Sequence, residues 1–195
     1  MPPDPAAPAA PADAEPPVEL RRSEELDAAD RAALRLLWDR AFSDFTDDDA
    51  AHAVHDGGGL HALVRHAGVP VAHASVVPRR LRFGAGPWRE VGYVEAVAVD
   101  PDHQRRGLGR RVMLALHPAI AARWPVALLS TGKSTGFYAR LGWERWGGLS
   151  FTRLADGTEV ADDEHGGLMI LRCDPTVVPD LRVDVTCEDR SGDAW

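Results

Sequence analysis

The segment from Val91 to Arg111 constrains the fold of this chain more than any other. It begins with a run of β-branched and aromatic residues that ends at Val99, where Asp100 and Pro101 stop it. Gly107-Leu108-Gly109 then opens an amphipathic helix, so the segment predicts a strand, a tight basic loop and a helix start. A short apolar strand over 126–130 follows, and this strand, helix, strand order predicts a parallel pair joined by a right-handed crossover.

The loop within this segment has the properties of a pyrophosphate-binding site. Gly107 and Gly109 carry no side chain, so consecutive backbone N–H groups can converge on a phosphate, and the helix dipole adds its field. Positive charge at the same place comes from four arginines, Arg105, Arg106, Arg110 and Arg111.

The rest of the chain alternates helical and extended patterns, which predicts an α/β protein, or α+β under stricter naming. Helices are expected over about 27–42, capped by Asp27 or Ser23, from Thr46 to about His55, from about 107 until Pro118 kinks or ends the helix near His117, and over 134–141. Strands are expected over 18–22, 60–66, 69–77, 91–99, 126–130, 143–151, 158–161 and 167–173, followed by an extended tail to Trp195.

Length and composition limit the classes of protein that fit. The chain has 195 residues, of which 45% are hydrophobic, so residues 18–195 are expected to form one domain. Residues 1–17 contain seven prolines and six alanines and are expected to be a disordered tail. A formal charge of −8 disfavours nucleic acid and favours a cationic partner. Without a signal-peptide pattern or a long apolar span, a cytoplasmic protein that does not bind membranes is expected.

Several motifs resemble those of one family. Gln104-Arg105-Arg106-Gly107-Leu108-Gly109 resembles the Q/R-x-x-G-x-G/A signature of the GCN5-related N-acetyltransferases (GNAT). The segments 93–99, 137–143 and 186–195 are together similar to the aminoglycoside 2′-N-acetyltransferases. The resemblance implies the GNAT fold, a mixed, mostly antiparallel central sheet flanked by helices with a βαβ core that binds acetyl-CoA, and a homodimer. The implied acetyl-CoA ligands are Val97, Ala98, Val99, Gln104, Arg105, Arg106, Gly107, Leu108, Gly109 and Arg110.

The chemistry of acetyl transfer needs two proton-handling groups. An amine bound at neutral pH arrives as ammonium and must lose a proton before it attacks a thioester, and Glu95 is the candidate base. The resemblance implies that Glu95 acts through a bound water and that Tyr138 is the acid that protonates the departing thiolate. Backbone near Ala96, where family members often have glycine, is expected to hold the acetyl carbonyl. The alternatives are an exposed strand carboxylate for Glu95 and a core tyrosine for Tyr138.

Acidic residues are the candidates for binding a polyamine acceptor. The resemblance implies that Asp49, an acid of the 162–164 run (Asp163 or Glu164), Asp193 and the α-carboxylate of Trp195 line the acceptor site together with Glu95 and Ala96. Acidic helix caps, a solvated loop and a frayed chain end are the alternatives.

Other motifs in the sequence could indicate different chemistry. His52 and His55 have a spacing that could place two metal ligands on one helix face, but neutral solvent-facing histidines fit better, and no metal is expected. Cys173 and Cys187 are expected to be free thiols, although their pairing stays open. The favoured hypothesis is an acetyl-CoA-dependent aminoglycoside 2′-N-acetyltransferase that confers resistance. An acetyltransferase for another polyamine or a protein amine, and a non-catalytic acyl-CoA-binding module, are the alternatives.

Overall fold

Ten strands form one mixed sheet in the computed structural model, which describes residues 16–54, 58–162, 167–178, 180–192 and 194–195. The expected tail of residues 1–17 lies outside the described residues apart from Pro16 and Pro17. Along the sheet the strands follow the order β6-β9-β5-β4-β3-β10-β7-β8, and β1 and β2 continue it from β3. Pairing is mostly antiparallel, with parallel contacts between β4 and β5 and between β10 and β7. The predicted fold class is confirmed.

The elements follow the expected order. The helices are α1 (Ala28–Ala41), α2 (Asp47–Ala53), α3 (Leu108–Arg123) and α4 (Thr135–Ala139), with short 3-10 turns at Ser23–Glu25 and Pro101–His103. The strands are β1 (Val18–Arg22), β2 (Leu60–His66), β3 (Val69–Phe83), β4 (Trp88–Val99), β5 (Val126–Ser130), β6 (Glu144–Arg145), β7 (Ser150–Arg153), β8 (Glu159–Ala161), β9 (Leu168–Arg172) and β10 (Val185–Glu188). None of the described helices is long and apolar enough to cross a bilayer.

Two expectations about these elements are wrong. Of the kink or end expected near His117, the end is wrong, because helix α3 runs through Pro118 to Arg123. Ile120 and Trp124 are 0% and 4% exposed, so packing of the last turn offsets the hydrogen bond that the proline cannot donate. The single strand expected over 143–151 is instead two short strands, β6 and β7, which pair with β9 and β10 respectively.

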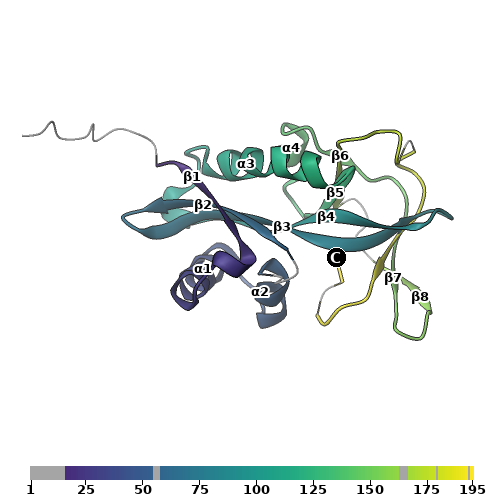
Figure 1. The fold of residues 1–195 in the computed structure, drawn as a ribbon, viewed down its shortest axis with the longest axis horizontal. Coiled ribbons are helices and arrows are strands. Elements are labelled where there is room, and N and C mark those ends of the chain that lie inside the picture. The colour runs from purple at the N-terminus through teal and green to yellow at the C-terminus, as the bar shows by residue number, and fades with distance from the viewer. Residues whose placement is uncertain (1–15, 55–57, 163–166, 179, 193) are drawn as a thin grey trace, which may run out of the picture.

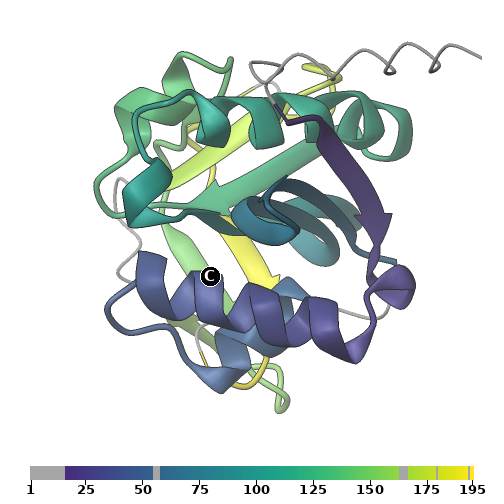
Figure 2. The ribbon, with the colours of Figure 1, turned by 90° about the vertical axis from the view of Figure 1, so that its left-hand side faces the viewer.

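Helices cover both faces of the sheet. α3 and α4 lie on one face, and α1 and α2 lie on the opposite face (Figures 1 and 2). The α3 side is packed by a large apolar cluster that includes Val112, Leu116 and Met169, whereas Leu34, Leu37 and Trp38 of α1 pack the other side. The first half of β3 and the second half of β4 therefore lie between two helical layers (Figure 1).

Strand pairing is interrupted at two places near the middle of the sheet. β4 pairs with β5 only at Gly92–Ala127 and Tyr93–Leu128, so the β4 backbone beyond Tyr93 is not in register with β5. On its outer edge β3 pairs with β2 up to Val76 and with β10 from Leu81, which leaves residues 77–80 between the two partners. The chain end lies near this gap, close to the centre of the molecule (Figure 1).

Candidate active site

A β-bulge in β4 places Glu95 at the centre of the molecule. Ser75 pairs with Glu95 and His73 pairs with Ala98, so Ala74 alone faces two residues, Ala96 and Val97. Ala96 takes the left-handed φ of +49°. Because a bulge bends its strand and re-aims the neighbouring side chains, this one turns β4 away from β5.

A buried chain of polar groups holds the bulge. His73 Nδ1 lies 2.8 Å from the Ala96 carbonyl oxygen, His61 Nδ1 lies 3.0 Å from His73 Nε2, and Ser23 Oγ lies 3.0 Å from His61 Nε2. The same His73 Nδ1 lies 3.2 Å from Trp38 Nε1, which only donates, whereas the Ala96 carbonyl only accepts. Because the contact with Ala96 is the shorter one, we assign the proton of His73 to Nδ1, and the other donors of the chain then follow in order from Ser23. Burial lowers the pKa of His73 to about 3 and that of His61 to about 4, so both rings are neutral at pH 7.

Replacing Ala96 with glycine is expected to stabilise the fold slightly. A left-handed φ costs a non-glycine residue roughly 1 kcal/mol, and glycine avoids this cost. Glycine also gives the unfolded chain more conformational entropy, which offsets part of the gain. We therefore expect the free energy of unfolding to rise by about 0.5 kcal/mol. Urea unfolding followed by circular dichroism measures it. Ala98→Gly is the matched control, because Ala98 is 2% exposed and is not among the positive-φ residues, so this variant should lose stability. If Ala96→Gly lowers the free energy of unfolding as much as Ala98→Gly does, the backbone of Ala96 is not strained.

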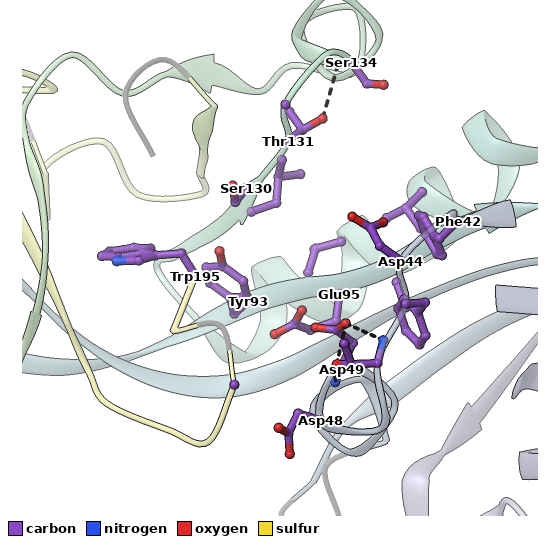
Figure 3. Close-up of a pocket in the computed structure, with 18 of the residues that line it drawn as sticks. Phe42, Asp44, Asp48, Asp49, Tyr93, Glu95, Ser130, Thr131, Ser134 and Trp195 are labelled. Carbon is purple, nitrogen blue, oxygen red and sulfur yellow. Dashed lines mark hydrogen bonds between the residues drawn. The ribbon is translucent and has the colours of Figure 1, made fainter. Parts of the chain in front are cut away.

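A cavity of about 610 Å³ opens where β4 leaves β5. This volume is typical of small-molecule sites. We call it the central cavity; it is lined by Phe42, Asp44, Phe45, Thr46, Asp48, Asp49, Tyr93, Val94, Glu95, Ala96, Val97, Leu129, Ser130, Thr131, Gly132, Ser134, Tyr138, Gly192 and Trp195. In Figure 3, Glu95 lies between Tyr93 and Asp49, while Ser130 and Thr131 of the β5 end lie across from the acids.

Glu95 is a buried carboxylate in this cavity. Its side chain is 14% exposed, and its Oε1 accepts a hydrogen bond of 2.7 Å from Arg190 Nη1. Burial raises the pKa of Glu95 above its ordinary value, the Arg190 and Arg79 charges act in the opposite direction, and Asp49 raises it further. The alternative of an exposed strand carboxylate is therefore wrong, and the geometry is compatible with a base.

Tyr138 is the fourth of the five residues of α4 and lines the same cavity. It is 7% exposed and packs edge-on against Phe137, with 4.9 Å between the ring centroids. Burial raises the pKa of Tyr138 to about 12, so its phenol stays protonated at neutral pH and can donate a proton or hydrogen bond. Tyr138 is thus both a core residue and a cavity residue.

The basic loop has the geometry expected for binding phosphate. Gly107 is the N-cap of α3 with a φ of +77°, and no side chain caps the helix there. A Cβ built on Gly107 meets no heavy atom within 4 Å, so the space beside the N-cap is open. The first N–H groups of a helix have no partner within the helix and can bind an anion. Arg105, Arg106 and Arg110 are exposed around the loop. A Cβ on Gly109 would lie 3.6 Å from Phe137 Cζ, which sets the loop beside the helix that carries Tyr138.

The residues of β4 that were expected to bind acetyl-CoA, Val97 to Val99, do not all reach the central cavity. Val97 lines the central cavity, whereas Ala98 is 2% exposed and packs toward α1. Val99 accepts a hydrogen bond of 3.3 Å from Gln104 Nε2 at its carbonyl, so the end of β4 is tied to the basic loop. Of these three residues, Val97 is therefore the one that lines the central cavity.

Two aspartates of α2 reach the cavity. Thr46, where this helix was expected to begin, is the N-cap of α2. Asp49 Oδ2 accepts hydrogen bonds from Thr46 N at 2.8 Å and Thr46 Oγ1 at 2.7 Å. Asp48 also lines the cavity, whereas Asp47 pairs with Arg35. Asp49 is therefore both a helix cap and part of the cavity wall. Asp163, Glu164 and Asp193 lie outside the described residues.

The chain end is docked. Trp195 is 5% exposed, lines the central cavity, and donates a hydrogen bond of 3.0 Å from Nε1 to Asp162 Oδ2. Arg79 Nη2 donates to the Ala194 carbonyl at 2.8 Å. A frayed end is therefore the wrong alternative, and Asp162 supports Trp195 without itself lining the cavity.

The remaining candidates from the sequence do not form a site. Within the described ranges, no group of His, Cys, Asp and Glu is arranged to hold a metal ion. His52 is half-buried, whereas a solvent-facing side chain was expected, and burial lowers its pKa. His55 lies outside the described residues. Cys173 is exposed and Cys187 is buried, and both are free thiols.

Some residues of the site could not be found from the sequence. Arg190, His73 and the aromatic pair Phe42 and Phe45, stacked at 5.1 Å between centroids, contribute to the site from segments without a motif. The only local signal was the acidic, tryptophan-terminated chain end that includes Arg190.

Comparison with known proteins gives a consistent result. Residues 23–143 match the model of the acetyltransferase (GNAT) family. The chain is 34% identical over 183 residues to the aminoglycoside 2′-N-acetyltransferase of Mycolicibacterium fortuitum, an alignment that covers 90% of each chain. The Escherichia coli GNAT family N-acetyltransferase YhbS, solved in complex with CoA, superimposes with a TM-score of 0.60 at 18% identity, over 93% of this chain and 97% of that one. A GCN5-related N-acetyltransferase from Kribbella flavida gives a TM-score of 0.53 at 22% identity, covering 68% of this chain but 35% of the other.

Proposed function

Because this chain belongs to the GNAT family of acetyltransferases, we propose that it transfers the acetyl group of acetyl-CoA to the 2′-amine of aminoglycosides. The observation that carries the proposal is the central cavity, which is lined by the largely buried Glu95, by Asp48 and Asp49, and by Tyr138. A cavity with several carboxylates favours a cationic acceptor, and an aminoglycoside carries several ammonium groups. The name of the Mycolicibacterium fortuitum relative supports the same acceptor.

The proposed binding of acetyl-CoA uses the open end of α3. The N–H groups that follow Gly107, with Gly109 and the exposed arginines, would hold the pyrophosphate. Backbone of Val97 to Val99 would hold the arm that leads into the cavity. When bound there, acetyl-CoA supplies an activated acetyl thioester.

The proposed mechanism assigns one proton transfer to each of two residues. Glu95, acting through a water, removes a proton from the ammonium of the acceptor so that the neutral amine can attack. Tyr138, whose phenol is protonated at neutral pH, donates a hydrogen bond or a proton to the thiolate that departs. Its raised pKa makes the phenol a weaker acid, which favours the hydrogen bond. Direct transfer needs no acyl-enzyme. Asp49, Asp163 or Glu164, Asp193 and the Trp195 carboxylate would bind the other ammonium groups of the acceptor.

The biological consequence that we propose is resistance. Acetylation removes the 2′-ammonium charge, which weakens the electrostatic attraction of the drug to ribosomal RNA. We further propose that the enzyme acts as a homodimer in the cytoplasm and that residues 18–195 form its catalytic domain.

The test is a comparison of two aminoglycosides that differ at one position. Kanamycin B has a 2′-amine and kanamycin A has a 2′-hydroxyl, and we expect CoA thiol release only with kanamycin B. The protein must have an untagged C-terminus, since Trp195 lines the cavity. Release with both compounds would place the reacting amine elsewhere. Release with neither, despite acetyl-CoA binding in calorimetry, would favour another amine acceptor or a non-catalytic acyl-CoA-binding protein.

A further inference from the structure

A residue of the C-terminal segment, Arg190, forms an ion pair with Glu95. Arg190 Nη1 lies 2.7 Å from Glu95 Oε1, and the two side chains are 15% and 14% exposed. The pair joins the middle of β4 to a segment 95 residues further along the chain. An ion pair this shielded from water differs from a surface pair, because removal of one partner leaves a buried charge without compensation.

Several contacts fix the backbone on both sides of Arg190. Arg79 Nη2 donates to the Glu188 carbonyl at 3.2 Å and to the Ala194 carbonyl at 2.8 Å. Ser191 Oγ donates to Asp48 Oδ1 at 3.1 Å. Gly192 has a φ of +74°, and a Cβ there would lie 2.8 Å from Asp48 Cβ, so the segment lies directly on α2. The position of Arg190 is therefore set by the fold.

Arg190 also contacts an aromatic ring of the cavity wall. Its Cζ lies 5.9 Å from the centroid of the Tyr93 ring, and Arg79 Cζ lies 5.1 Å from the same centroid. Cation–π attraction of this kind orients a guanidinium and limits its motion. The hydrogen bond then engages Oε1 of Glu95, and Oε2 is the oxygen through which a water or an acceptor amine can be bound.

We propose that Arg190 is a positioning residue for the reaction: it holds Glu95 as an oriented carboxylate, ready to take up a proton. The inference rests on the proposed function in so far as Glu95 is the base. Among the described residues, the charged groups that act on Glu95 are Arg190 from the C-terminal segment, Arg79 from β3 and Asp49 from α2; His52 of α2 is neutral. Burial and Asp49 favour the protonated carboxyl, which cannot act as a base, and the two arginines oppose them.

Removal of Arg190 is therefore expected to alter protonation of Glu95. In Arg190→Gln the pKa of Glu95 should rise by about one pH unit or more, because a paired cation within hydrogen-bonding distance lowers a carboxyl pKa by roughly that amount. The acid limb of the kcat profile should move to higher pH by the same amount. At a pH on that limb, turnover should fall about tenfold for each pH unit by which the limb moves, and it should return as the pH is raised. The KM for acetyl-CoA should not change.

The titration is measured without any acceptor, from the ¹³C carboxyl resonance that disappears in Glu95→Gln. Arg190→Lys keeps the charge and should restore most of the pKa and turnover. Arg80→Gln is the matched control, since Arg80 pairs with Glu188 of the same C-terminal segment at 2.9 Å, and it should change neither quantity. Arg190→Met, which keeps an unbranched stem beside Tyr93, replaces the glutamine variant if that variant does not fold.

The outcomes separate this inference from the proposed function. If wild-type protein acetylates no aminoglycoside but the Glu95 pKa rises in Arg190→Gln, the acceptor assignment fails and the role of Arg190 stands. If the Glu95 pKa is the same in wild type and Arg190→Gln, the inference is overturned whatever the activity. A loss of turnover that is equal at every pH and is not rescued by lysine also overturns it, because a purely structural role has that signature.

Discussion

Glu95→Gln is expected to lower kcat by about 10²–10⁴-fold, the usual loss when a positioned general base is removed. Glutamine has nearly the same shape as glutamate and can still accept the hydrogen bond from Arg190, so the central cavity should keep its form. It cannot take up a proton from an ammonium group. Steady-state release of CoA thiol with kanamycin B measures the loss, and calorimetry should give the wild-type affinity for acetyl-CoA.

The pH dependence provides a second check on this variant. Burial places the pKa of Glu95 above the ordinary value for glutamate, so wild-type kcat should rise with pH as this group loses its proton. The glutamine variant should lack that limb. Glu90→Gln is the control on the same strand, because Glu90 is exposed and bonds Trp124 Nε1 at 2.9 Å outside the cavity. Unchanged turnover in Glu95→Gln would eliminate Glu95 as the base.

Deletion of Trp195 is expected to raise the KM for the aminoglycoside by about 10- to 100-fold, the factor that corresponds to losing one charge-assisted hydrogen bond of roughly 1.5–3 kcal/mol. The deletion removes a cavity wall and moves the terminal carboxylate, while the basic loop before α3 is untouched. The KM for acetyl-CoA should therefore stay constant. Initial rates at varied concentrations of each substrate give both constants.

Two further variants separate the contribution of the Trp195 indole from that of its α-carboxylate. Trp195→Phe keeps the α-carboxylate but loses the hydrogen bond from Nε1 to Asp162, and it should have a smaller effect. Extension of the chain by Gly-Ser keeps the indole but moves the carboxylate. If the extended protein has the wild-type KM, the carboxylate does not bind the acceptor. If the deletion raises the KM for acetyl-CoA as much as that for the aminoglycoside, Trp195 has a general structural role.

The sequence predicted most of the helices and strands, because turn residues, helix caps and the spacing of apolar residues act over a few neighbouring positions. The strands expected over 60–66 and 69–77 and the helix expected from Thr46 each depend on a pattern of a few neighbouring residues, and β2, β3 and α2 form there. The errors arose where packing outweighed a local preference. Pro118 is tolerated because the buried Ile120 and Trp124 hold the end of α3. The 143–151 segment is divided because β6 and β7 pair with different strands.

By itself, the sequence determined the family, the candidate phosphate-binding loop and the two candidate proton-transfer residues, because each belongs to a contiguous motif whose chemistry depends on neighbouring atoms. Only the tertiary structure decided what surrounds those residues. The left-handed Ala96 held by His73, the burial that raises the pKa of Glu95, and the Arg190 that pairs with Glu95 all depend on contacts between distant segments. Charge and burial act through space, so a pattern along the chain cannot specify them.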